Sequence, residues 1–128
     1  MSRRSALGRA RGQGSAQDGV GEWWLQRLTS VALIVLGAWF VVCLVALPAR
    51  DYSAVAAWMR AGWTAPLLVL FVIASAWHSQ LGVRVVIEDY VHGLGAKTVA
   101  LALAAFAHVL IAAVAVYAVL RVALRSPL

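Results

Sequence analysis

Three apolar stretches, each long enough to cross a lipid bilayer, constrain this chain more than any other feature. They cover residues 25–47, 66–87 and 97–120. A transmembrane helix needs about 20 consecutive apolar residues, so each stretch is sufficient. Only 12% of the residues are charged, which is about half the share found in soluble domains. The sequence therefore predicts an all-α integral membrane protein with three transmembrane helices.

The connections between these stretches are short. Residues 51–63 cannot span a membrane, and they mix apolar residues with Asp51, Arg60 and two tryptophans. This mixture predicts a short interfacial helix between the first and second spans. The second span begins near Pro66, because proline is favourable in the first turn of a helix. Residues 91–96 contain two glycines and predict a turn before the third span.

The N-terminal segment differs in composition from the rest of the chain. Residues 1–20 contain four arginines and no apolar core of a secretory signal. We therefore expect a flexible basic N-terminal tail over residues 1–20 and a single three-helix transmembrane anchor domain over residues 21–128. Five arginines lie in the first 27 residues, against only Arg50 and Arg60 in the first loop. The positive-inside bias then places the N-terminus in the cytoplasm.

Composition also excludes several classes of site and partner. The net charge of +6 would suit nucleic-acid binding, but the hydrophobicity favours the membrane instead, and we expect no nucleic-acid partner. Cys43 is the only cysteine. A single cysteine excludes a disulfide framework, a cysteine-pair zinc site and a cysteine-ligated cluster.

The second span carries an unusual stripe of residues. His78, Gly82 and Asp89 lie nearly on one line at 100° per residue. An ionisable side chain inside a membrane span is costly and marks a functional site by default. His78 suits an axial haem ligand, and the alternative is a structural histidine in an interhelical hydrogen bond. Gly82 leaves bare backbone one turn further on, where a flat ring or another helix can approach.

Asp89 and Tyr90 end the second span. A tyrosine hydroxyl there can donate a hydrogen bond to a quinone carbonyl, and a nearby carboxylate can deliver protons. The alternative is ordinary interface chemistry, with tyrosine in the aromatic belt and acids at the helix end. Acids are unfavourable at a helix C-terminus, which favours a specific role.

The pattern of His78, Gly82 and Asp89-Tyr90 at the end of the second span resembles the hydrophobic membrane-anchor subunit of succinate dehydrogenase, respiratory complex II. The start of the first span, Glu22-x-x-x-x-Arg27-x-Thr29, is also similar to that family. The resemblance covers about residues 20–122 and leaves only the tail outside it.

The resemblance implies an assembly and a division of roles. Three helices would pack against a second, cytochrome b556-type anchor subunit in the bacterial inner membrane. His78 would be one of two axial ligands to a shared haem b, with Gly82 allowing close approach of the haem. Tyr90, with Asp89 beside it, would bind ubiquinone. The iron-sulfur and flavoprotein subunits would dock on the cytoplasmic face, and this chain would not touch succinate.

Four further polar residues have more than one interpretation. Arg27 could pair with a haem propionate, contact the quinone site or face the iron-sulfur subunit, or it could snorkel to head groups as a topology marker. Arg84 lies about 120° from the stripe, so snorkelling competes with a propionate contact. His92 could shuttle protons or contact the iron-sulfur subunit, and the alternative that we favour is an exposed loop histidine. His108 is a rival haem ligand by chemistry, but its lack of an acidic-aromatic companion favours a helix–helix hydrogen bond.

Two other classes of function stay open. One is a cofactor-free small membrane assembly or structural protein. The other is a transporter subunit in which His78 and Asp89 relay protons, although a transporter should carry paired ionisable groups along a pore. The electron-transfer anchor is the interpretation that gives a role to His78, Gly82 and Asp89 together.

Overall fold

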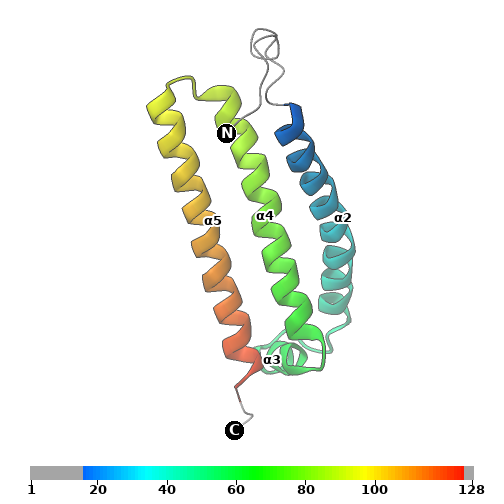
Figure 1. Cartoon of the computed structure of the whole chain (residues 1–128). Helices are drawn as coiled ribbons and strands as arrows, with labels where there is room; N and C mark the ends of the chain where they lie inside the picture. Colours follow the sequence, from blue (N-terminus) through cyan, green and yellow to red (C-terminus); the bar gives the residue numbers. More distant parts are fainter. Residues whose placement is uncertain (1–15, 126–128) are drawn as a thin grey trace.

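The computed structural model describes residues 16–125 of the chain. Within them it contains four helices, and α4 lies between α2 and α5 in Figure 1. The helices are α2 (Ala16–Ala46), α3 (Tyr52–Arg60), α4 (Thr64–Tyr90) and α5 (Leu94–Ala123). Three segments are long and apolar enough to cross a membrane: Val20–Ala46, Thr64–Tyr90 and Leu94–Ala123. The predicted all-α fold, with three spanning helices and a short helix between the first two, is confirmed.

Two boundaries differ from the sequence-based expectation. The turn predicted over residues 91–96 occupies only residues 91–93, since α5 already begins at Leu94. The backbone N–H of Lys97 donates to the Gly93 carbonyl at 2.8 Å and closes a helical turn through Gly95. At the other end of the chain, residues 16–20 of the expected tail belong to α2. The rest of that tail lies outside the described residues.

Helix α3 is fixed at its start by a capping residue. The Asp51 carboxylate accepts hydrogen bonds from the Ala54 backbone N–H at 2.8 Å and from the Ser53 hydroxyl at 2.9 Å. These bonds favour the charged carboxylate and lower the pKa of Asp51, with the Ala54 bond as the largest cause. After α3 the chain reverses at Gly62, whose φ of +42° is accessible to glycine at little cost.

Aromatic side chains hold the three elements together at the α3 end. The Trp58 ring of α3 lies 6.0 Å from Trp39 and 6.1 Å from Phe40, both on α2. Phe40 in turn stacks on Phe71 of α4, with ring centroids 5.4 Å apart. The Phe71 ring also lies against Gly37, where an added Cβ would meet it at an ordinary van der Waals distance of 3.9 Å. Aromatic contacts therefore join α2, α3 and α4 at this end of the layer.

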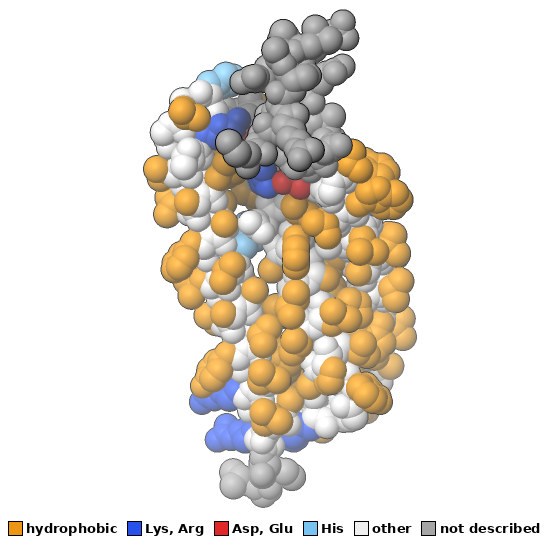
Figure 2. Space-filling model, viewed as in Figure 1, with side chains coloured by type: hydrophobic (Ala, Val, Ile, Leu, Met, Phe, Trp, Pro, Cys, Tyr) orange, Lys and Arg blue, Asp and Glu red, His pale blue; other side chains and the backbone are white. Residues whose placement is uncertain are grey.

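The three long helices form an open layer. Helix α4 packs against both α2 and α5, whereas α2 and α5 do not pack against each other within residues 16–125. Very few hydrophobic residues in this part of the chain are buried: Leu36, Ala56, Leu68 and Ala74. Figure 2 shows hydrophobic side chains along the length of the helices, with Lys and Arg gathered at the two ends. Such a surface needs lipid or other protein chains to cover it.

Candidate functional site

His78 lies in the second span and faces the first one. The side chain is half-buried, and its Nδ1 lies 3.0 Å from the hydroxyl oxygen of Thr29 on α2. The two residues are 49 positions apart in the sequence. The hydrogen bond joins α2 to α4 and sets the direction of the imidazole ring. No side-chain hydrogen bond of Nε2 is found within the described residues, so this ring nitrogen is left for another partner.

Thr29 is held from its other side by the backbone of its own helix. Its hydroxyl oxygen lies 2.7 Å from the Leu25 carbonyl and 3.1 Å from the Gln26 carbonyl. Threonine often bonds back to the carbonyl four residues earlier in a helix. The hydroxyl is therefore fixed in position before it meets His78.

The α4 surface beyond His78 is open at Gly82. A Cβ built at Gly82 meets nothing within 4 Å, apart from its own helix backbone. This glycine is therefore not required for packing between the described helices. Helix α4 is continuous from Thr64 to Tyr90, so the bare backbone stays one turn along from His78, as the sequence predicted. The surface can receive a flat ring or a helix from outside the chain.

Asp89 and Tyr90 lie at the end of α4, where both are exposed. Asp89 is about 16 Å along the helix axis from His78 at 1.5 Å per residue. The Tyr90 side chain is 79% exposed, so this chain alone does not enclose it. His92 is also exposed, as expected, and its Nδ1 lies 3.1 Å from the Tyr90 carbonyl. A substrate pocket here needs walls from another chain.

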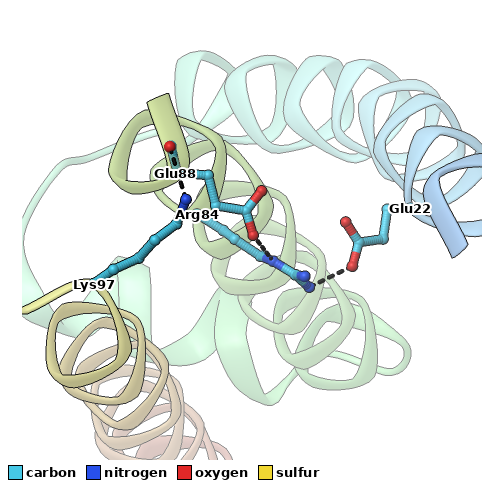
Figure 3. A network of polar contacts seen from close by, with 4 residues as sticks. All are labelled: Glu22, Arg84, Glu88 and Lys97. Atoms are coloured by element: carbon cyan, nitrogen blue, oxygen red, sulfur yellow. Dashed lines mark hydrogen bonds and ion pairs between the residues drawn. The ribbon is translucent and has the colours of Figure 1, made fainter. Parts of the chain in front are cut away.

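An ion-pair network that the sequence did not predict lies at the same end of the layer (Figure 3). Arg84 pairs with Glu22 of α2, and its Nε donates to Glu88 at 2.8 Å. Lys97 of α5 adds a hydrogen bond from its Nζ to the Glu88 backbone carbonyl at 2.9 Å. The network therefore ties all three long helices together next to Asp89. The Arg84–Glu88 pair follows the i, i+4 spacing of neighbours on a helix surface. No such spacing in the sequence indicates the pairing of Arg84 with Glu22 on α2.

The network also changes the interpretation of the acidic end of α4. Two acids at a helix C-terminus are unfavourable, and the pairing with Arg84 accounts for Glu88. Asp89 has no side-chain partner within the described residues. Of the two acids at the C-terminus of α4, only Asp89 therefore lacks, in the described part of the chain, an ion pair that offsets its unfavourable position.

His108 makes the helix–helix hydrogen bond that the sequence predicted. Its Nε2 lies 3.1 Å from the Ser79 hydroxyl of α4, and its Nδ1 lies 2.7 Å from the Ala104 carbonyl of its own helix. Both ring nitrogens are therefore engaged. To bind a metal, His108 would first have to break one of these bonds, whereas His78 would not.

Arg27 lies away from the His78 face of α2. Its guanidinium carbon is 5.4 Å from the centre of the Trp23 ring, within the range of a cation–π contact. Helical spacing places Arg27 about 160° around the helix from Thr29. The side chain is exposed at the end of the first span.

The donor set at His78 suits one kind of metal site better than others. Within residues 16–125, no three His, Cys, Asp or Glu side chains lie together as a bare metal ion would require. A haem iron needs only axial ligands from the protein. One half-buried imidazole beside bare backbone fits half of such a site.

Comparison with known proteins gives a consistent result. Residues 1–120 match the family model described as succinate dehydrogenase/fumarate reductase transmembrane subunit. The chain is 32% identical to the succinate dehydrogenase hydrophobic membrane anchor subunit of Paracoccus denitrificans, over 90% of this chain and 88% of that one. It is also 32% identical to the subunit of the same name from Rickettsia conorii, over 65% of this chain and 67% of that one. No solved structure matches.

Proposed function

Since the chain belongs to the family of succinate dehydrogenase and fumarate reductase transmembrane subunits, we propose that it supplies one haem b ligand and part of the ubiquinone site to a bacterial succinate dehydrogenase. The three apolar helices make it a multi-pass membrane protein. Its role is to anchor the complex and to hold groups that receive electrons. No succinate chemistry is assigned to this chain.

The observation that carries the proposal is the state of His78. The ring is half-buried, one nitrogen is committed to Thr29, and the other has no partner within the described residues. The open surface at Gly82 lies one turn away on the same helix. A haem bound there supplies a one-electron carrier enclosed between helices. The second axial ligand would come from the partner anchor subunit, because His108 is engaged elsewhere.

Ubiquinone reduction is assigned to the exposed end of α4. Conversion of the quinone to the quinol takes up two electrons and two protons at the two carbonyl oxygens. In this proposal the Tyr90 hydroxyl donates a hydrogen bond to one of these oxygens, which polarises the carbonyl. Asp89 passes protons from water to the site, and its exposure at the end of α4 supports this role. The electrons arrive from the iron-sulfur subunit on this face.

The charge pattern supports the orientation that this role needs. The N-terminal flank is richer in arginine than the first loop, which favours a cytoplasmic N-terminus. With three spans, Asp89 and Tyr90 then face the cytoplasm, where the flavoprotein and iron-sulfur subunits would dock. Arg27 is exposed on the same side, and its stacking on Trp23 favours contact with a docked subunit or head groups over contact with a propionate.

The test is the haem content of the purified complex in two histidine variants. We expect His78→Ala to abolish the low-spin haem absorption, because the iron loses an axial ligand. His108→Ala serves as the matched control, since it removes a histidine from a neighbouring span, and it should leave the haem in place. Full haem content in His78→Ala would refute the ligand assignment. Absence of haem from the unaltered complex would instead favour the cofactor-free alternative.

A further inference from the structure

We propose that Thr29 is a positioning residue for His78. Its hydroxyl accepts the Nδ1 proton, so that the Nε2 lone pair is the one presented to the iron, and it makes the imidazole a stronger donor. This inference rests on the proposed haem role of His78.

Proton counting fixes the direction of the hydrogen bond. The Thr29 oxygen lies 2.7 Å from the Leu25 carbonyl oxygen. A carbonyl oxygen only accepts, so the single hydroxyl proton must lie between these two atoms. The Gln26 carbonyl at 3.1 Å is a second acceptor on the same side. The Thr29 hydroxyl therefore has no proton left for His78 and presents a lone pair to it.

The tautomer of His78 follows from this arrangement. With Nδ1 at 3.0 Å from an accepting oxygen, Nδ1 must carry the proton. A neutral imidazole has one N–H, so Nε2 carries the lone pair. Without Thr29 the ring could place its proton on either nitrogen. The threonine thus selects the form of the ring that is able to bind iron through Nε2.

His108 has a different pattern of hydrogen bonds. Its Nδ1 donates to the Ala104 carbonyl, and its Nε2 accepts the Ser79 hydroxyl proton. Its lone pair is therefore already used. Of these two histidines in spanning helices, His78 is the one whose hydrogen bond leaves Nε2 free within the described residues.

The hydrogen bond should also tune the iron. An acceptor on the outer N–H of a ligating histidine raises the basicity of the ligand. The acceptor strength of the Thr29 oxygen is increased by its own bond to Leu25, since hydrogen bonds in a chain polarise one another. A more basic imidazole stabilises the oxidised iron, which carries the higher charge. The bond should therefore lower the midpoint potential of the haem.

The experiment compares three variants in the intact complex. Thr29→Val keeps the branched shape and removes the acceptor, Thr29→Ser keeps the hydroxyl, and Ser30→Ala is the matched control. Ser30 also donates to a carbonyl of α2, that of Gln26 at 2.7 Å, but no hydrogen bond to His78 is found. The readouts are haem affinity, the midpoint potential from a redox titration, and the electron paramagnetic resonance spectrum of the oxidised haem.

We expect Thr29→Val to raise the midpoint potential, change the resonance spectrum and weaken haem binding about 10- to 100-fold. Thr29→Ser should restore all three properties, and Ser30→Ala should match the unaltered complex. If the valine variant does not assemble, Thr29→Ala removes the same hydroxyl with a smaller side chain and allows the same comparison.

The result separates this inference from the function on which it rests. An unchanged potential and spectrum in both Thr29→Val and Thr29→Ala, with haem lost in His78→Ala, would overturn the role of Thr29 and leave the ligand intact. An equal shift in Ser30→Ala would also overturn it. Haem retained in His78→Ala would instead remove the proposed function itself.

Discussion

The hydroxyl oxygen of Thr29 on the first span lies 3.0 Å from the Nδ1 of His78 on the second span. This contact joins two helices that otherwise meet through apolar side chains and the Glu22–Arg84 pair. The imidazole of His78 therefore lies in the layer of helices with its Nδ1 hydrogen-bonded to Thr29.

A side chain added at Gly82 should not disturb the fold of this chain, but it should interfere with haem binding in the assembled complex. A Cβ at this position meets nothing within 4 Å, and replacing glycine by alanine inside a helix is favourable by about 1 kcal/mol. We therefore expect Gly82→Ala and Gly82→Leu to insert and fold normally, with progressive loss of haem as the side chain grows. Haem content per assembled complex is the measurement.

Gly95→Ala and Gly95→Leu are the matched controls for this series. A Cβ at Gly95 also meets nothing within 4 Å, but the residue lies at the start of α5. Both variants should retain haem. Full haem content in Gly82→Leu would show that neither a haem nor a partner helix approaches α4 there.

Tyr90→Phe should reduce quinone reduction while leaving the haem in place. The change removes one hydroxyl, and the loss of one hydrogen bond to a substrate costs about 0.5–1.5 kcal/mol, or up to about tenfold in rate. The measurement is succinate-driven reduction of a ubiquinone analogue, compared with reduction of an artificial acceptor that takes electrons from the soluble subunits.

Tyr117→Phe controls for the general removal of an exposed tyrosine hydroxyl. Tyr117 is 65% exposed and lies near the opposite end of α5. It should leave both activities unchanged. Equal quinone activity in Tyr90→Phe and the unaltered complex would contradict the role assigned to Tyr90.

The Glu22–Arg84 pair should make a small contribution to stability. Both side chains are more than one-third exposed, at 43% and 44%, and exposed ion pairs typically contribute about 0.2–1 kcal/mol. A double-mutant cycle with Glu22→Gln and Arg84→Gln, measured by denaturant inactivation of the complex, should give a coupling energy in this range that weakens with added salt. A coupling energy above about 2 kcal/mol that is insensitive to salt would mean that a partner chain buries the pair.

The sequence predicted the helices well because the signal for each lies within a single segment. Twenty or more apolar residues identify a span, and the mixed composition of residues 51–63 identified the short helix. The prediction of a turn over residues 91–96 was wrong at its C-terminal half for a physical reason. Glycine is a weak helix former, but α5 starts at Leu94, and the hydrogen bond from the Lys97 N–H to the carbonyl of Gly93, the N-cap, closes its first turn around Gly95.

The sequence predicted the part of the candidate site that lies within one helix, but not which residues of α2 contact it. Helical spacing placed His78 and Gly82 on one face, since that relationship lies within one helix. The partner of His78 lies 49 residues away and depends on how α2 packs against α4. Thr29 stood out only through its place in the Glu22-to-Thr29 pattern. Glu22 likewise meets Arg84 across 62 residues, which no local spacing rule predicts.

An experimental structure of the intact complex with its haem bound would test the proposed role of His78 directly. We predict that the iron lies at bonding distance from His78 Nε2, that the opposite axial ligand comes from the partner anchor subunit, and that Thr29 stays hydrogen-bonded to Nδ1. A structure in which both axial ligands come from elsewhere, with His78 directed away from the iron, would show that His78 is not a haem ligand.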